Sequence, residues 1–363
     1  MAVFDVVFEG GGAKGSAFVG ALTALESAHH ITRRLIGTSA GAITATLRAA
    51  GYSPAEMLAA VNEKVSGKPR FSSFMDRPTG ANFTPQQRAA SSTMVALRDV
   101  HVPLFADNVV LDLLLDSPLF PQLFSFVECG GFFAGDNFLA WLTEKLAAKG
   151  LAAGDTLATF FAKTQSDLSV VTSDTSDMEM LVLNHRTAPD VPIAWAVRMS
   201  MSIPFVWREV VWQDAWGTYQ GRPKTGNILV DGGVLSNFPI RLIAEPAPDI
   251  MGDTDPNGAL NLGLLLDETL AIPGTNPALP PEPLEQLRVV QRISRLMDTM
   301  MGAQDNQEIR ERAPEICRLP VKGYGTTEFN MSDDRLKALV DAGASAVQAH
   351  LQARGLDSAT ASG

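Results

Sequence analysis

The sequence predicts an α/β fold of three layers, α/β/α, in which helices cover both faces of a parallel or mixed sheet. Short apolar runs rich in Val, Ile and Leu alternate along the chain with segments of helix-forming residues. Two of these runs end in glycine-rich turns that lead directly into helices. Such alternation is typical of sheets whose parallel strands are joined by helices that pack on the two faces.

Two units of strand, turn and helix occupy the first fifty residues. Val and Phe dominate residues 3–8, and the glycine cluster after them leads into a helix-compatible stretch at 16–25. A second short strand is expected at 34–37, before a helix at 40–50, and a capping-box sequence predicts a helix from 53 to about 65. The other expected elements are strands at 168–172, 180–183, 228–230 and 260–266 and helices at 138–148, 193–199, 284–301 and 333–353.

We expect residues 1–363 to form a single domain with two interruptions. Residues 66–130 have weak periodicity, and the 73 residues from 66 to 138 hold ten of the 18 phenylalanines, which marks an aromatic insertion and a candidate lid. Five prolines make residues 272–283 a stiff connection, and a helical C-terminal part follows at 284–354.

The charge balance and the cysteine count exclude several kinds of protein. With 29 Lys and Arg against 40 Asp and Glu, the net charge is −11, which is unsuited to binding nucleic acid. Cys129 and Cys317 have no metal-ligand spacing with the five histidines, so we expect no metal and no cofactor. The N-terminus lacks a basic lead-in, and the longest apolar stretch is broken by Asp and Pro, so neither a signal peptide nor a membrane span is expected.

One window of the chain differs in charge from the rest. Residues 64–98 hold six basic residues and one acidic residue, a charge of +5, together with phenylalanines of the insertion. Such a surface suits contact with a lipid bilayer, the alternative being a solvated loop. We therefore expect a cytoplasmic protein that binds peripherally at membranes.

A serine in a G-x-S-x-G motif is the candidate nucleophile. The motif is Gly37-Thr38-Ser39-Ala40-Gly41, at a predicted junction of strand and helix. Its glycines allow a sharp turn that exposes the hydroxyl of a serine held in a strained conformation. The alternative is a glycine-rich turn with a helix-capping serine.

A second glycine cluster, Gly10-Gly11-Gly12-Ala13-Lys14-Gly15, follows the first strand. Its backbone amides suit an oxyanion hole, which stabilises the charge on a tetrahedral intermediate. The same spacing fits a dinucleotide-binding turn, but that use expects a carboxylate at the end of the second strand, where Gly37-Thr38-Ser39 stands. A Walker loop is excluded because Gly15, rather than Ser or Thr, follows Lys14.

The candidate base is an aspartate, because no histidine lies in a glycine-rich context. Asp231-Gly232-Gly233 follows the apolar strand at 228–230, where a tight turn can present the carboxylate at the edge of the sheet. An aspartate is a weak base at its usual pKa, so geometry and partial desolvation would have to assist it. The alternative is an ordinary turn.

The three motifs in this order resemble the patatin-like phospholipase family of serine lipid hydrolases, which use a Ser–Asp dyad without histidine. The segments 135–138, 200–205 and 236–239 also resemble the family, and the similarity extends over about 3–239. The resemblance implies an acyl hydrolase of phospholipids or related lipids, with a patatin-like sheet and no cofactor. It implies Ser39 as nucleophile, Asp231 as base, an oxyanion hole from Gly10, Gly11, Gly12 and Ala40, and motif support from Lys14, Gly15, Gly37, Gly41, Gly232 and Gly233.

Two other functions stay open from the sequence. One is a nucleotide-binding α/β protein, and the other is an interaction or regulatory module on the same fold with little turnover. The insertion also has two interpretations, since its aromatic rings either line an acyl groove or lid or form ordinary core. The rings concerned are Phe71, Phe74, Phe105, Phe120, Phe124, Phe126, Phe132 and Phe133.

Overall fold

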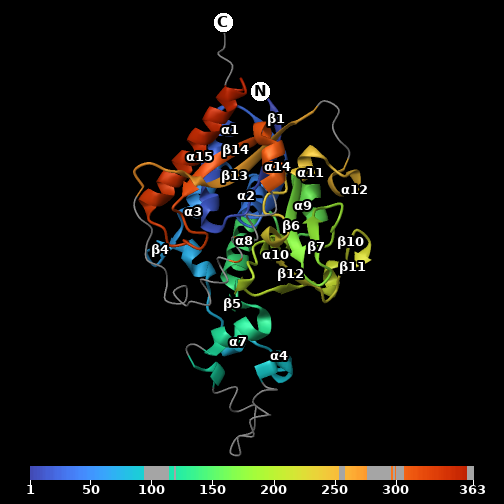
Figure 1. The fold of residues 1–363 in the computed structure, drawn as a ribbon. Coiled ribbons are helices and arrows are strands. Elements are labelled where there is room, and N and C mark those ends of the chain that lie inside the picture. Colours follow the sequence, from blue (N-terminus) through green and yellow to red (C-terminus); the bar gives the residue numbers. More distant parts are fainter. Residues whose placement is uncertain are drawn as a thin grey trace, which may run out of the picture.

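A mixed sheet of eight strands forms the centre of the protein (Figure 1). The computed structural model describes residues 1–93, 114–117, 120–252, 258–275, 296, 299 and 306–357. The strand order is β14-β13-β1-β2-β6-β12-β9, and β7 also pairs with β6. The first five strands of this order are parallel to one another. The pairs β6–β7, β6–β12 and β12–β9 are antiparallel. The strands are β1 (Val3–Phe8), β2 (Ile31–Thr38), β6 (Asp167–Asp174), β7 (Glu179–Leu183), β9 (Val210–Val211), β12 (Ile228–Asp231), β13 (Leu260–Ala271) and β14 (Ile316–Lys322).

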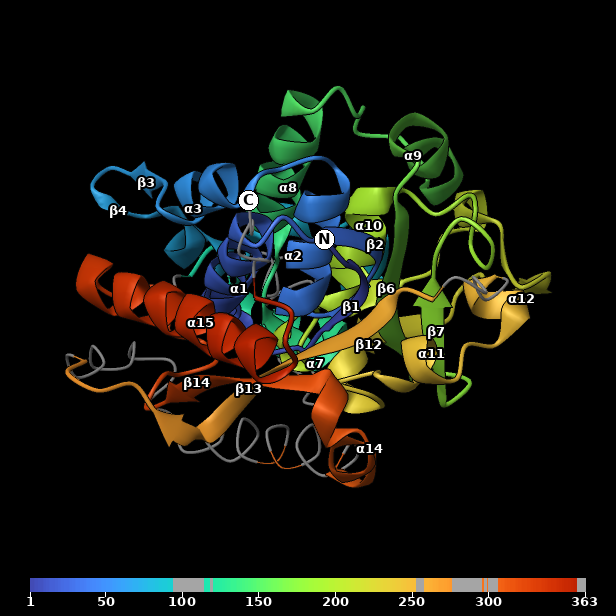
Figure 2. The same ribbon diagram turned by 90° about the horizontal axis from the view of Figure 1, so that it is seen from above.

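Helices cover both faces of the sheet, as the sequence predicts. The larger layer contains α1 (Ala17–Ser27), α2 (Ala40–Ala49), α3 (Pro54–Val61), α8 (Asp136–Ala148), α9 (Leu157–Thr164), α10 (Ile193–Ser200) and α15 (Asp333–Ala353). The opposite layer contains α11 (Arg241–Ala244), α12 (Pro248–Met251) and α14 (Asn306–Glu311). Figure 2 shows α15 and α14 on opposite sides of β13 and β14.

The two faces of β1 illustrate how the sequence builds two cores. Phe4, Val6 and Phe8 point into the larger apolar cluster, whereas Val7 points into the smaller one under α11 and α12. Successive side chains of a strand project to opposite faces, so a strand covered on both sides needs apolar residues on both; β1 has them except at Asp5, whose buried carboxylate pairs with Arg33.

The aromatic insertion projects from the end of the sheet that lies opposite the chain termini (Figure 1). Its described helices are α4 (Pro85–Ala90) and α7 (Phe120–Cys129), and Phe83, Leu115 and Phe124 form a small core between them. Residues 94–113 and 118–119 of the insertion lie outside the described part of the chain. The short strands are β3 (Lys64–Val65), β4 (Lys68–Pro69), β5 (Gly131–Phe133), β8 (Phe205–Trp207), β10 (Thr218–Tyr219) and β11 (Arg222–Pro223).

The expected elements agree with the structure, with a few differences. The predicted extension of a helix to residue 65 is wrong, because α3 ends at Val61 and a tight turn through Ser66 and Gly67 pairs β3 with β4. The sequence analysis missed α9 and β14. The predicted helix at 284–301 and most of the proline-rich connection lie outside the described residues.

Candidate active site

Strand register brings the three predicted motifs to one edge of the sheet. Phe8 of β1 pairs with Gly37 of β2, and Thr38 pairs with Val171 of β6. Because β12 runs antiparallel to β6, its last residue, Asp231, pairs with Thr172. The glycine cluster, the serine turn and the aspartate therefore meet around the same end of β6.

Ser39 occupies a strained turn between β2 and α2. Its backbone has φ 53° and ψ −118°, a region that side chains other than Gly rarely adopt. A Cβ on Gly37 would lie 2.2 Å from the carbonyl carbon of Gly41, and a Cβ on Gly41 would lie 2.2 Å from the carbonyl oxygen of Phe8. Since the Ser39 side chain makes no capping hydrogen bond, the interpretation as a simple cap does not hold.

Asp231 is completely buried at the end of β12. Its Oδ1 accepts a hydrogen bond from the Gly233 amide at 2.8 Å, and its Oδ2 has no hydrogen-bond partner among the described residues. Burial raises the pKa of Asp231 to about 7, and the neighbouring Ser39 hydroxyl and the Gly233 amide offset part of that rise. A carboxylate with this pKa is a far better base at neutral pH than an ordinary aspartate.

The C-terminal end of α10 holds the backbone of both residues. The Ser39 amide donates to the Ser200 hydroxyl oxygen at 2.9 Å, and that hydroxyl donates to the Val171 carbonyl at 2.6 Å. Two residues further on, the Ser202 carbonyl accepts from the Asp231 amide at 2.9 Å. The sequence analysis identifies residues 200–205 only through the family resemblance. The contacts of Ser200 with Ser39 and of Ser202 with Asp231 join segments that are far apart in the sequence.

The glycine cluster places only some of its amides at the site. The Gly10 amide donates to the Asn237 carbonyl at 3.0 Å, so we remove Gly10 from the predicted oxyanion donors. The amides of Gly11 and Gly12 donate to no acceptor within the described ranges. Ala40 is the first residue of α2, where an amide has no partner inside the helix. These three amides remain the candidate donors.

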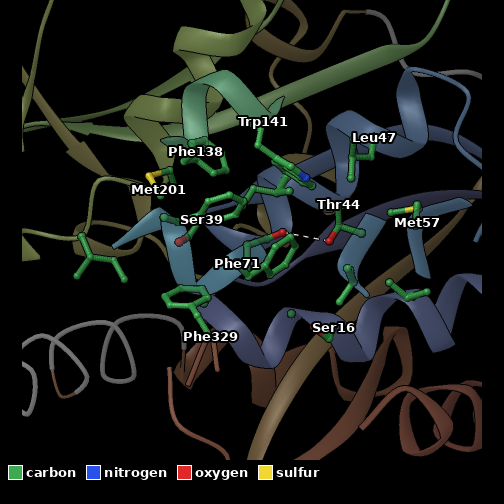
Figure 3. A pocket seen from close by; sticks show the side chains of 18 of the residues that line it. Ser16, Ser39, Thr44, Leu47, Met57, Phe71, Phe138, Trp141, Met201 and Phe329 are labelled. Atoms are coloured by element: carbon green, nitrogen blue, oxygen red, sulfur yellow. Dashed lines mark hydrogen bonds between the residues drawn. The ribbon is translucent and has the colours of Figure 1, made fainter. Parts of the chain in front are cut away.

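Ser39 lies where two cavities of different character meet. One encloses about 690 Å³ of space, open mouth included, and its walls are almost entirely apolar. Figure 3 shows Ser39, Phe138, Met201 and Phe329 at one side of it, Leu47 and Met57 at the other, and Phe71 and Trp141 between. The second, of about 1050 Å³, has a polar lining that includes Glu9, Lys14, Asn237, Asp267, Glu268 and Arg318.

Comparison with known proteins identifies the family. A family model described as patatin-like phospholipase matches residues 6–244. The chain belongs to the patatin-like phospholipase family. It is 29% identical over 348 residues to the uncharacterized protein YqhO of Bacillus subtilis, covering 93% of this chain and 94% of that protein.

Other relatives and structural neighbours of this chain are more distant. The probable lipid hydrolase 463L of Invertebrate iridescent virus 6 is 25% identical over 111 residues, 31% of this chain and 34% of that protein. Among solved structures, VipD of Legionella pneumophila matches with a TM-score of 0.46 at 16% identity, over 97% of this chain and 67% of VipD. The type III effector ExoU matches with a TM-score of 0.43 at 19% identity, over 97% of this chain and 53% of ExoU.

Only part of the aromatic insertion reaches the candidate site around Ser39. Phe71 and Phe74 line the apolar cavity. Phe132 and Phe133 are buried in the main core, and Phe124 belongs to the small core of the insertion. Phe120 and Phe126 pack against those two cores, and Phe105 lies outside the described residues.

Among the described residues, one group of carboxylates is close enough together to hold a metal ion: Asp174, Asp177 and Glu179. The ammonium of Lys224 already sits between them, 2.9 Å from Asp174 and 2.6 Å from Asp177 and in contact with Glu179. This group is an ion-pair cluster in which the buried Lys224 joins the buried Asp174, the half-buried Glu179 and the exposed Asp177, and it does not line either cavity at Ser39.

Removing the Ser200 hydroxyl is expected to lower kcat about tenfold on a small p-nitrophenyl ester. The Ser200→Ala change leaves the Ser39 amide without its acceptor, and a buried unpaired amide costs about 1–3 kcal/mol. Ser202→Ala is the matched control, because it also removes a buried serine hydroxyl, one bonded to Arg198, and leaves the backbone carbonyl that holds Asp231. Equal losses of kcat in the two variants would contradict a specific role for Ser200 at Ser39.

Proposed function

We propose that this protein is a lipid acyl hydrolase that cleaves a carboxylic ester of a phospholipid or related lipid through an acyl-enzyme on Ser39. The main support for the proposal is that Ser39, with its strained backbone, lies beside the carboxylate of Asp231. The Oδ2 atom of that carboxylate is buried and has no hydrogen-bond partner among the described residues. Ser39 also lies at the junction of the apolar and the polar cavity. The apolar cavity suits an acyl chain, and the polar cavity suits the glycerol and headgroup. Ser39 stands where the ester between them would lie.

In the acylation step, Asp231 Oδ2 takes the proton of the Ser39 hydroxyl while Ser39 Oγ attacks the ester carbonyl carbon. The amides of Gly11, Gly12 and Ala40 would stabilise the oxyanion of the tetrahedral intermediate. Collapse of the intermediate breaks the bond to the alcohol, which leaves with the proton held by Asp231. Water then attacks the acyl-enzyme, Asp231 accepts its proton and returns it to Ser39 Oγ, and the fatty acid is released.

The proposed substrate is a membrane component, and none of the described helices has the length and apolar character needed to cross a bilayer. We therefore propose peripheral contact with the membrane surface, as the basic and aromatic composition of the insertion favours. The viral relative named a probable lipid hydrolase supports the same class of substrate.

Labelling with a fluorophosphonate probe tests the proposal. The probe should attach to Ser39 of the wild-type protein, and Ser39→Ala should lose both labelling and at least about 10³-fold of its ester hydrolysis. Circular dichroism and thermal unfolding of the variant provide the control for folding. Retained hydrolysis in a folded Ser39→Ala protein would exclude Ser39 as nucleophile, and a regulatory module would show no turnover in the wild type.

Filling the far end of the apolar cavity is expected to shift the preferred chain length. Residues Ala40, Ile43, Thr44 and Leu47 of α2 line the cavity in succession away from Ser39. Leu47→Trp should therefore lower kcat/KM for a palmitoyl ester about tenfold, while the butyryl ester is hydrolysed almost as by the wild type. Equal effects on both esters would place the acyl chain elsewhere.

A further inference from the structure

Trp141 and Trp207 both line the apolar cavity, but their indole N–H groups differ in what they bind. Trp207 donates from Nε1 to the Phe74 carbonyl at 2.8 Å. Trp141 is completely buried, and its Nε1 has no hydrogen-bond partner among the described residues. A buried tryptophan usually finds an acceptor for this group, because a donor left unpaired away from water is costly. The fold supplies no such acceptor to Trp141, so its N–H is available to a molecule in the cavity.

The indole ring of Trp141 is held in one orientation by its neighbours. Three aromatic rings pack against it at centroid distances of 5.3, 5.3 and 6.0 Å: Phe71, Phe74 and Phe138. Figure 3 shows the nitrogen of Trp141 on the side of its ring that lies toward Thr44 and Leu47, which line the same cavity. A donor that is already fixed in place binds an acceptor without the entropic cost of ordering a mobile side chain.

Trp141 lies partway along the cavity, at a distance from Ser39. The Tyr52 hydroxyl, just beyond the C-terminal end of α2, donates to the carbonyl of Lys145, which is one turn after Trp141 on α8. Ser39 precedes the other end of α2, a helix of ten residues and so about 15 Å long. An acyl chain with its ester at Ser39 would therefore meet Trp141 several carbon atoms away from the ester carbonyl.

An indole N–H can only donate a hydrogen bond, so the group that it binds must carry an acceptor. An unsubstituted alkyl chain has none, whereas a hydroxyl or oxo oxygen on the chain would fit. We propose that the apolar cavity binds an acyl chain that carries an oxygen atom partway along it, and that Trp141 Nε1 donates to this oxygen. The inference rests on the proposed function and narrows its substrate class to esters of oxygenated fatty acids. Trp141 is then a specificity residue.

Kinetics with matched esters test the role of Trp141. The substrates are p-nitrophenyl decanoate and its derivatives with a hydroxyl or an oxo group at mid-chain. The ratio of kcat/KM for each oxygenated ester to that for the plain ester should be about tenfold lower in Trp141→Phe than in the wild type. Trp207→Phe is the matched control, because it removes an N–H that is already bonded within the protein, and it should leave the ratios unchanged. Unchanged ratios in Trp141→Phe, or equal losses in the two variants, would overturn the proposal.

A binding experiment separates this proposal from the proposed catalysis. In a Ser39→Ala background with ¹⁵N-labelled tryptophan, the Trp141 indole resonance is the one missing from the spectrum of the variant that also carries Trp141→Phe. Mid-chain hydroxydecanoic acid, below its micelle concentration, should move this resonance downfield, and decanoic acid should not. That result would support the oxygen site even if the wild-type protein hydrolysed no ester. The same shift with both acids, or no shift with the hydroxy acid, would overturn it.

Discussion

Asp231→Asn is expected to remove ester hydrolysis and to stabilise the folded protein above pH 7. The loss of activity, about 10²- to 10⁴-fold, follows because the amide cannot accept the proton of Ser39. The gain in stability follows because the native protein buries this carboxylate completely, with Oδ2 unpartnered within the described structure. One substitution should therefore separate the catalytic benefit of the buried charge from its cost to folding.

The sign of the pH dependence follows from the two pKa values of Asp231. In the unfolded chain the carboxyl ionises near the ordinary aspartate pKa of 3.8, whereas in the native state its pKa is about 7. Between these values the native state binds more protons than the unfolded state, so the stability of the wild-type protein falls as pH rises. The full difference corresponds to about 4 kcal/mol, an order-of-magnitude figure that is reached above pH 7.

Urea unfolding at pH 4 and pH 8 checks this expectation. The Asn variant should exceed the wild type by roughly 2–4 kcal/mol at pH 8 and by little at pH 4. Ser39→Ala, which is equally inactive but retains the carboxylate, should not show the same gain. In the wild type, kcat/KM for a small ester should rise with pH to a plateau above about 7. A midpoint near 4 would mean that Asp231 is not the base, or that it is solvated during turnover.

Sequence patterns predict the proposed Ser39–Asp231 dyad because local chemistry determines each of its parts. The glycines around Ser39 are required by backbone atoms a few ångströms away, and Asp231 is the last residue of a strand of four residues. The order of the strands, and hence the meeting of the two turns at β6, is a long-range property. The sequence analysis predicts no strand order; only the family resemblance implies that Ser39 and Asp231 act together.

The parts that sequence analysis missed depend on contacts between distant segments. Ser200 is recognisable as a positioning residue only once α10 is placed against β2, and Gly10 loses its place among the oxyanion donors only because Asn237 approaches it. β14 was missed because Arg318 and Pro320 interrupt its apolar pattern at positions that are exposed or half-buried. The residues that line the apolar cavity come from several helices and turns, so the periodicity of any one segment does not predict the cavity.

Lys224→Met is expected to destabilise the protein by about 3–5 kcal/mol. Lys224 is 1% exposed and its ammonium contacts Asp174, Asp177 and Glu179, of which Asp174 is completely buried. Burial alone would lower the pKa of Lys224, but the hydrogen bonds that its ammonium donates to the three carboxylates outweigh burial and raise the pKa above its usual value. The stabilisation is therefore fully present at neutral pH, and it would be lost only as pH rises through that raised pKa.

The cost of Lys224→Met comes mainly from the charge that it leaves behind on Asp174. The double variant Lys224→Met with Asp174→Asn removes that charge, so it should recover part of the lost stability in a urea-unfolding cycle. A double variant less stable than Lys224→Met would contradict this reasoning.

The ion-pair cluster around Lys224 should also affect catalysis. Asp174 pairs with Leu229 of β12, two residues before Asp231, so a loosened cluster should lower kcat before the protein unfolds. Restoring kcat together with stability in the double variant would show that the ion cluster acts on the dyad through the register of β12.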